Sequence, residues 1–115
     1  IAAFEAAFEV NMPDTVMTGY NAANGVYCAD DHGLLRGILR QELGFDGFVM
    51  TDWNGYGDQG MNGALDAGIS WLAPGGNDDT LVLPIVQALE SGKLSRARAQ
   101  KNLVDMVKVL IKYMK

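Results

Sequence analysis

The chain has 115 residues, of which 49% are hydrophobic and 20% are charged, and its formal net charge is −5. This length allows one domain at most, and the composition is that of an ordinary globular protein. The acidic balance disfavours nucleic acid or an anionic membrane surface as a partner, and no apolar run approaches the roughly 20 residues that a membrane span needs.

Two residue types restrict the kinds of site that this chain can build. Cys28 is the only cysteine and His32 the only histidine, so no disulfide can form within the chain and no metal-site spacing is present. We therefore predict no metal and no cofactor. The chain begins at Ile1, without an initiator methionine, which indicates a cut or processed chain, and export stays open because a signal peptide would lie upstream.

The first part of the chain reads as a helix followed by a strand. Ile1, Phe4 and Phe8 fall at helical spacing, and the pattern predicts a helix that ends near Val10. After the break at 11–14, residues 15–20 (TVMTGY) predict a strand. Residues 21–25 (NAANG) follow as a loop with turn chemistry.

A second helix is predicted over about residues 33–43. Asp30 and Asp31 can cap its start, and Gly44 stands where a helix commonly ends in a left-handed glycine. The residues of its apolar face are Leu34, Leu35, Ile38, Leu39 and Leu43.

The stretch from Gly44 to Trp53 (GFDGFVMTDW) predicts a central buried strand. The continuous apolar run Phe48-Val49-Met50 is typical of a strand in a parallel sheet. It ends in Thr51-Asp52-Trp53, which places a carboxylate and an indole at the carboxyl end of a strand. Such ends carry the chemistry of α/β proteins. From this local pattern alone, an aspartate that merely caps the next helix is an equally good interpretation of Asp52.

The remaining elements continue the alternation of helix and strand. A helix over residues 60–67, a strand over 69–73 and a helix over about 80–90 are each followed by glycine-containing turns. Ser95 can cap a last amphipathic helix over about 95–114. We expect its apolar face to pack in the core; that face consists of Ala99, Leu103, Met106, Val107, Leu110 and Met114.

This order of elements predicts an α/β fold with parallel β/α units. Three strands are too few for a doubly wound domain or a closed barrel. We therefore expect residues 1–115 to be part of a larger α/β fold, near its end.

At several places the sequence resembles glycoside hydrolase family 3. The segment 16–53 contains VMTGYN, NGV, LLRGILR and GFDGFVMTDW, which are similar in order to the motifs around the catalytic nucleophile of that family. ALDAG at 64–68, APG at 73–75 and QALESGKLSRA at 87–97 resemble motifs that follow in the family. The segment 69–73 departs from the family's more usual Leu-Asp-x-x-Met.

The resemblance implies a retaining, exo-acting glycosidase of the β-glucosidase type, in which this chain supplies the last three units of a (β/α)8 barrel. Asp52 falls on the family's nucleophile, and Trp53, Tyr20 and Met17 fall on residues that line its sugar-binding subsite. These residue types suit the chemistry. A carboxylate can attack the anomeric carbon, an aromatic face packs on a sugar ring, and a tyrosine hydroxyl can orient a carboxylate.

The same resemblance implies partners within one protein. The sugar-holding Lys-His pair of the family would lie upstream, and the acid/base residue would lie outside this chain, in another domain for β-glucosidases. The expected substrate is a β-glucoside or oligosaccharide. A β-N-acetylhexosaminidase or β-xylosidase of the family, a non-catalytic carbohydrate-binding relic and a phosphate-binding barrel enzyme are the alternatives; Asp78 and Asp79 disfavour the last because they would repel phosphate.

Overall fold

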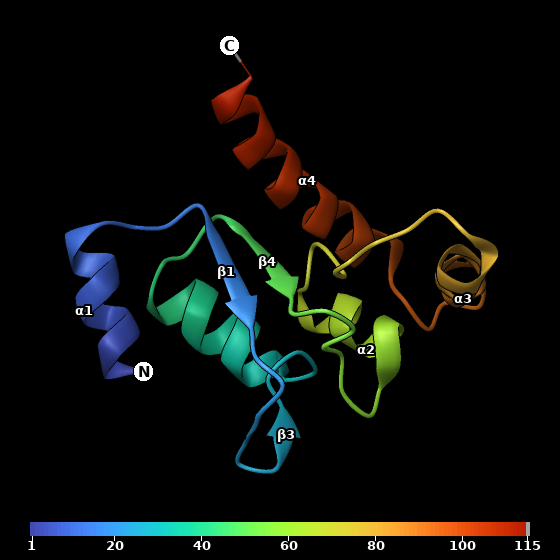
Figure 1. The fold of residues 1–115 in the computed structure, drawn as a ribbon, viewed down its shortest axis with the longest axis horizontal. Coiled ribbons are helices and arrows are strands. Elements are labelled where there is room, and N and C mark those ends of the chain that lie inside the picture. The colour runs from blue at the N-terminus through green and yellow to red at the C-terminus, as the bar shows by residue number, and fades with distance from the viewer. Residues whose placement is uncertain (115) are drawn as a thin grey trace.

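The computed structural model describes residues 1–114, which form helices and short strands (Figure 1). The elements are α1 (Ala2–Val10), β1 (Thr15–Thr18), β2 (Ala22–Ala23), β3 (Val26–Tyr27), η1 (Gly33–Glu42), β4 (Phe48–Thr51), α2 (Gly60–Ala67), α3 (Asp79–Glu90) and α4 (Arg96–Tyr113). No helix within residues 1–114 is long and apolar enough to cross a membrane.

The strands β1 and β4 form a parallel pair, as the sequence predicts. Thr15 pairs with Phe48 and Thr18 with Thr51, so both strands run in register for their whole length. The predicted third strand, 69–73, is reduced to one parallel bridge between Met50 and Trp71. This prediction was wrong in extent, although the backbone of the segment still bonds to β4 through Ser70 N–H to Val49 O (2.7 Å).

The hydrophobic core lies on the helix side of this pair of strands. Val49 and Ile69 are fully buried, and Leu35 of η1 packs in the same cluster with an exposed fraction of 2%. Helix α1 contributes only Phe8, whose ring stacks on that of Phe45 with centroids 6.1 Å apart. The core therefore packs against the face of β1 and β4 that carries Val49. We refer to the opposite face, which carries the 55% exposed Met17, as the open face.

The second predicted helix is present but is wound more loosely than an α-helix. In η1 the hydrogen bonds connect residues five apart, and this pattern reaches the C-terminal end, where Leu43 N–H donates to Ile38 O (2.9 Å). Of its predicted apolar face, Leu35 and Leu39 are buried. Asp31 caps the start, since its Oδ1 accepts from Leu34 N–H at 3.0 Å, and Gly44 adopts the predicted left-handed conformation with φ of 70°.

The loop predicted at 21–25 is a small β-hairpin instead. Ala22 pairs with Tyr27 and Ala23 with Val26, and the turn between them is made by Asn24 and Gly25. Both turn residues have positive φ (52° and 85°), which is the geometry of the tight turn that Asn-Gly favours. The turn chemistry was therefore predicted, but not the pairing on either side of it.

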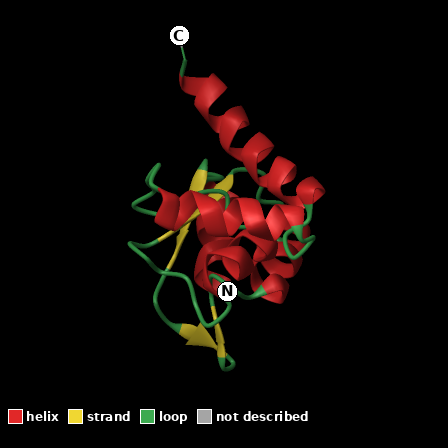
Figure 2. Ribbon diagram, turned by 90° about the vertical axis from the view of Figure 1, so that its right-hand side faces the viewer, coloured by secondary structure: helices red, strands yellow, loops and turns green. Residues whose placement is uncertain are grey.

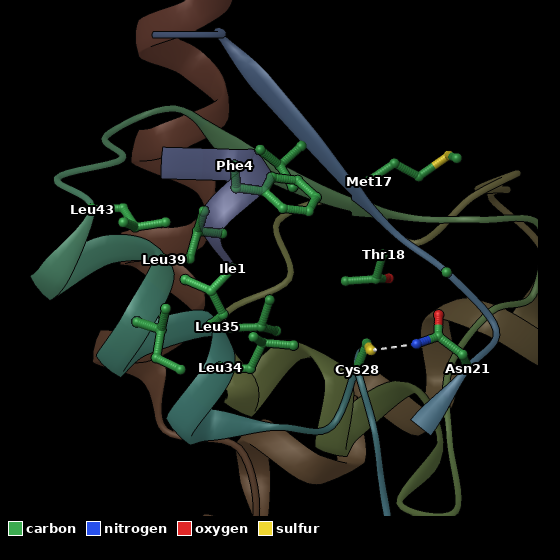
Figure 3. A pocket seen from close by; sticks show the side chains of 13 residues that line it. Ile1, Phe4, Met17, Thr18, Asn21, Cys28, Leu34, Leu35, Leu39 and Leu43 are labelled. Atoms are coloured by element: carbon green, nitrogen blue, oxygen red, sulfur yellow. Dashed lines mark hydrogen bonds between the residues drawn. The ribbon is translucent and has the colours of Figure 1, made fainter. Parts of the chain in front are cut away.

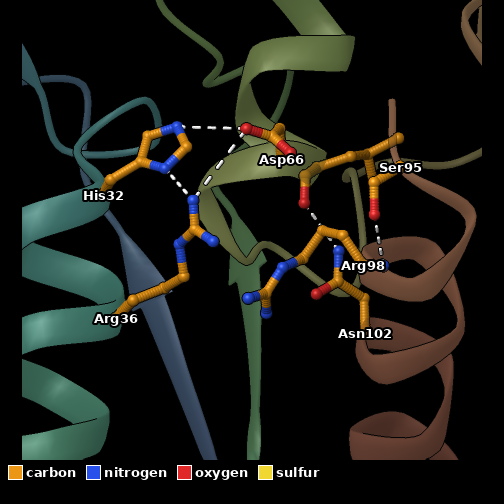
Figure 4. Close-up of polar contacts among 7 residues, drawn as sticks. His32, Arg36, Asp66, Ser95, Arg98 and Asn102 are labelled. Carbon is orange, nitrogen blue, oxygen red and sulfur yellow. Dashed lines mark hydrogen bonds and ion pairs between the residues drawn. The ribbon is translucent and has the colours of Figure 1, made fainter. Parts of the chain in front are cut away.

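The three C-terminal helices have the predicted positions. Asp78 caps α3 by accepting from Thr80 N–H (3.0 Å) and Leu81 N–H (3.2 Å), and Ser95 caps α4 by accepting from Arg98 N–H (3.0 Å). Beside the cap of α4, Asn102 donates to Leu65 O at 2.7 Å, which ties α4 to α2 (Figure 4). In the same view, Nε2 of His32 lies 3.4 Å from the Asp66 carboxylate, which links the start of η1 to α2.

The expectation that the apolar face of α4 packs in the core was wrong. The buried residues of α4 are polar, Asn102 and Asp105, while Leu103 and Leu110 are 54% and 51% exposed. These two polar residues have fixed partners, since Asn102 donates to Leu65 O and Arg40 Nη1 lies 3.4 Å from the Asp105 carboxylate. Ala99 and Met106 of the predicted face are half-buried beside them. Figures 1 and 2 both show the C-terminal turns of α4 extending beyond the strands.

The last turn of α4 contacts the residue before β1, and this contact depends on pH. Asp14 accepts from Lys112 Nζ (2.7 Å) and from the Tyr113 hydroxyl. The Lys112 hydrogen bond, followed by that of Tyr113, lowers the pKa of Asp14 below its usual 3.8. A carboxyl whose pKa is lower in the folded than in the unfolded protein stabilises the fold at pH values above its unfolded pKa. This stabilisation is lost as the pH falls through its folded pKa.

We expect Asp14→Asn to lower the hydrogen-exchange protection of the last turn of α4 at pH 7. The difference between wild type and variant should shrink as the pH falls from about 4 through the lowered pKa of Asp14, because the wild-type carboxyl is protonated below that pKa. Exchange of the Tyr113 and Met114 amides, followed by mass spectrometry, measures it. Equal protection of both proteins at neutral pH would show that the contact does not hold the helix end.

Candidate active site

Asp52 immediately follows β4, at the carboxyl end of the parallel pair. Its N–H donates to Thr18 O at 3.2 Å, so it still belongs to the ladder between β1 and β4. The backbone turns directly after it, since Gly55 N–H donates to Asp52 O at 2.9 Å. Its Oδ1 accepts from Trp53 N–H at 2.7 Å, which fixes the orientation of the carboxylate.

Two buried threonines hold this strand end in place. Thr51 is fully buried, and its Oγ1 accepts from Ala73 N–H at 2.9 Å. Thr18 is 5% exposed, and its hydroxyl donates to Met50 O at 3.4 Å. Because Asn54 N–H also donates to Ala73 O (2.8 Å), the segment after β4 is held by the neighbouring strand segment on both sides of Asp52.

Tyr20 lies beside Asp52 and ties the loop after β1 to the loop after β4. Its hydroxyl donates to Trp53 O at 2.8 Å, across 33 residues of sequence. Desolvation and, after it, the neighbouring Asp52 raise the pKa of the Tyr20 hydroxyl above 10, so the group stays a protonated donor near neutral pH. The structure thus brings together Tyr20, Asp52 and Trp53, three of the four residues singled out in the sequence.

Met17 is the fourth of these residues and lies on the open face of the sheet. It is level with Met50, two residues before Asp52. It pairs with Met50 in the register of β1 and β4. Figure 3 shows its side chain on the opposite side of β1 from Leu35 and Leu39 of η1. The side chains of Met17, Tyr20 and Trp53 are 55%, 58% and 62% exposed, so the residues around Asp52 present apolar and aromatic surface on this face.

Asp30 has a role at this end of the fold that the sequence did not reveal. It was expected to cap η1 together with Asp31, but its Oδ2 accepts from Gln59 N–H at 3.0 Å, in the loop that follows Trp53. In the same place Gly57 approaches so closely that a Cβ on it would lie 2.5 Å from Cβ of Tyr27. Because the carboxylate of Asp30 accepts from a backbone N–H 29 residues away, no short-range sequence pattern predicts this hydrogen bond.

A cavity of about 230 Å³ lies elsewhere, on the helix side of β1. It is lined by residues of α1, β1 and η1, with Cys28 and Asn21 at one end (Figure 3). Its lining is almost wholly apolar and includes Met17, but none of Tyr20, Asp52 and Trp53. We therefore assign the chemistry to the strand ends, where a carboxylate is present, and not to this cavity.

The arrangement suits a carboxylate that reacts with a ring-shaped, partly apolar ligand. Asp52 offers a carboxylate beside an exposed indole and a phenol, and aromatic faces of this kind pack on apolar rings. None of the hydrogen bonds that Asp52 makes within residues 1–114 comes from a second carboxyl group.

Comparison with known proteins relates these features to one family. Residues 1–109 match the family model described as "Glycosyl hydrolase family 3 N terminal domain". The chain is 38% identical over 109 residues to an exo-α-(1→6)-L-arabinopyranosidase of Bifidobacterium longum, an alignment that covers 91% of this chain and 14% of that protein. It is also 38% identical over 109 residues to a thermostable β-glucosidase B of Acetivibrio thermocellus, covering 95% and 14%.

Solved structures show the same relationship in three dimensions. A family 3 β-glucosidase of Bifidobacterium adolescentis superposes with a TM-score of 0.83 at 32% identity, over 96% of this chain and 16% of that one. β-Glucosidase 3B of Thermotoga neapolitana in complex with glucose superposes with a TM-score of 0.81 at 36% identity, over 94% and 16%. The chain thus spans about a seventh of the length of these relatives. It belongs to glycoside hydrolase family 3, and its parallel β/α units are part of the (β/α)8 barrel of that family.

Proposed function

We propose that this chain supplies the nucleophile strand of a retaining, exo-acting β-glucosidase, with Asp52 as the nucleophile. The observation that carries the proposal is the position of Asp52, at the carboxyl end of β4, with one carboxylate oxygen oriented by Trp53 N–H (2.7 Å). The carboxyl ends of the strands form the catalytic face of a (β/α)8 barrel. The β-glucosidases among the relatives support the substrate class.

The reaction proceeds in two displacements. A carboxylate oxygen of Asp52 attacks the anomeric carbon of the terminal sugar while the bond from that carbon to the leaving oxygen breaks. A second carboxyl group, about 5–5.5 Å away, gives its proton to the leaving oxygen. The same group then takes a proton from water, which attacks the glycosyl ester and returns the Asp52 carboxylate with overall retention at the anomeric carbon.

The other site residues bind the sugar in this scheme. Trp53 and Met17 offer apolar surface to the terminal sugar ring, and Tyr20 holds the Trp53 backbone through its hydroxyl (2.8 Å) beside the carboxylate. The acid/base group and the groups that bind most sugar hydroxyls come from the remainder of the barrel and from another domain of the same protein. Residues 1–115 are accordingly a partial barrel domain that ends in the helix α4.

The stereochemical course of hydrolysis tests this function. We expect the intact enzyme to release the β-anomer of glucose first from an aryl β-glucoside, as ¹H NMR of the anomeric protons resolves before mutarotation. An aryl α-L-arabinopyranoside should be tested in parallel, because the Bifidobacterium longum relative is an exo-α-(1→6)-L-arabinopyranosidase. First release of the α-anomer of glucose would exclude a covalent Asp52 intermediate.

Replacing Trp53 tests the sugar-binding part of the proposal. We expect Trp53→Ala to weaken glucose binding by about 1–3 kcal/mol because an exposed aromatic contact is lost. The inhibition constant of glucose as a product measures the effect. Val82→Ala on α3 is a matched control, since it also truncates an exposed apolar side chain but lies on a different element. Unchanged product inhibition in a folded Trp53→Ala enzyme would remove Trp53 from the subsite.

A further inference from the structure

The register of the strands places three large apolar side chains in one row. Met17 pairs with Met50 across β1 and β4, and Met50 pairs with Trp71 through the bridge to the next segment. Paired residues of neighbouring strands project from the same face of a sheet. The side chain of Met17 lies on the opposite side of β1 from Leu35 and Leu39 (Figure 3), so the register directs the Cβ of all three residues to the open face.

This row lies directly below the carboxylate. Asp52 follows Met50 by two residues and is still bonded to β1 through Thr18 O (3.2 Å). Since side chains alternate along a strand, Asp52 projects from the same face as Met50, about 7 Å further along.

The indole of Trp71 extends toward that end of the sheet. A Cβ placed on Gly75 would lie 3.1 Å from Nε1 of Trp71, so the N–H edge of the ring reaches the turn after Ala73. Gly75 has φ of 78°, a conformation that favours glycine, and the turn therefore keeps a small residue against the indole. Trp71 remains 41% exposed, although it stands between β4 and the α3 segment.

We propose that Trp71 is a specificity-determining residue that forms an apolar floor with Met17 and Met50 beneath a neutral terminal pyranose held at Asp52. This inference rests on the proposed function for the position of the sugar. The floor offers packing surface, so it contributes equally to bound substrate, product and transition state. Removing it should raise KM and the dissociation constant of the free sugar while it changes kcat little.

The alternative role for Trp71 is structural, because the residue also borders a cavity of about 210 Å³ on the helix side, together with Leu65, Leu81 and Met106. If the indole only fills space there, its removal should lower the melting temperature and leave the affinity for sugar unchanged. Leu81 is therefore the matched control, since it shares this cavity but is located on α3, away from the open face of the sheet.

The experiment compares Trp71→Leu, Trp71→Phe, Met50→Ala and Leu81→Ala in the intact enzyme, with glucose as the probe. Direct calorimetric titration gives the dissociation constant and needs no turnover, so it is independent of whether Asp52 is the nucleophile. We expect Trp71→Leu to weaken glucose binding about tenfold with kcat within about threefold of wild type, and Trp71→Phe to restore most of the affinity. Met50→Ala should weaken binding as well, and Leu81→Ala should lower the melting temperature alone.

Unchanged glucose affinity in folded Trp71→Leu and Trp71→Phe proteins would overturn the proposal and leave Trp71 a packing residue. An equal loss of affinity in Leu81→Ala would overturn it too, since the effect would then follow from the cavity. If Trp71→Leu does not fold, the test rests on Trp71→Phe and Met50→Ala. Wild-type affinity for glucose in both of these variants would refute the apolar floor.

Discussion

Asp52→Asn should reduce the turnover of the intact enzyme by several orders of magnitude. An amide cannot form the glycosyl ester through which a retaining glycosidase acts, while its shape preserves the hydrogen bond from Trp53 N–H to Oδ1. The dissociation constant of glucose should therefore change far less than kcat. Hydrolysis of an aryl β-glucoside, combined with direct titration of glucose, measures both quantities.

Asp58→Asn is the matched control, since it makes the same change six residues further along, on an exposed part of the same loop. We expect it to keep turnover close to that of wild type. A folded Asp52→Asn enzyme with near wild-type kcat, or a loss of equal size in Asp58→Asn, would contradict the role of Asp52.

The second large effect concerns a buried ion pair that joins η1, the start of β4 and α4. Asp105 is 1% exposed and pairs with Arg40 (3.4 Å) and with Lys101. Arg40 also donates to Gly47 O at 3.0 Å and lies 5.5 Å from the Phe45 ring centroid. Burial lowers the pKa of Arg40, and the Asp105 carboxylate opposes that shift. The guanidinium stays charged near neutral pH, so its buried charge needs the carboxylate as a partner.

We expect Asp105→Ala to destabilise the barrel domain by about 3–5 kcal/mol, because it leaves a buried guanidinium without its counter-charge. The double variant Arg40→Met/Asp105→Leu should be much closer to wild type, since apolar replacement of both partners removes the unpaired charge. Lys101→Met should cost less than about 1 kcal/mol, because its side chain is 50% exposed. Urea unfolding of the intact enzyme, followed on its barrel transition, measures all three. A double variant as unstable as Asp105→Ala would show that lost packing dominates.

Local patterns predicted the elements whose causes are local. The apolar run Phe48-Val49-Met50 became β4, and α2 occupies residues 60–67 as predicted, ended by Gly68 with φ of 120°. Side-chain caps also followed from residue type and spacing, as at Asp78 and Ser95. These features depend on contacts within a few residues, so periodicity and capping chemistry are sufficient to find them.

Features that depend on distant partners were not predictable in this way. The amphipathic pattern of α4 located the helix but did not show that Asn102 and Asp105 would be its buried residues. Their partners, Leu65 O and Arg40, are 37 and 65 residues away. For the same reason the tie from Asp30 to Gln59 and the position of Trp71 beside Met50 emerged only in the fold.

Trapping the covalent intermediate tests the central claim most directly. A 2-fluoro β-glucoside with a good leaving group slows the hydrolysis of the glycosyl ester, so a retaining glycosidase accumulates it. Peptide mapping of the inactivated intact enzyme by mass spectrometry should place the 2-fluoroglucosyl group on Asp52, and Asp52→Asn should take up none. A label on another acid, such as Asp58 or Asp46, would contradict the assignment of Asp52 as the nucleophile.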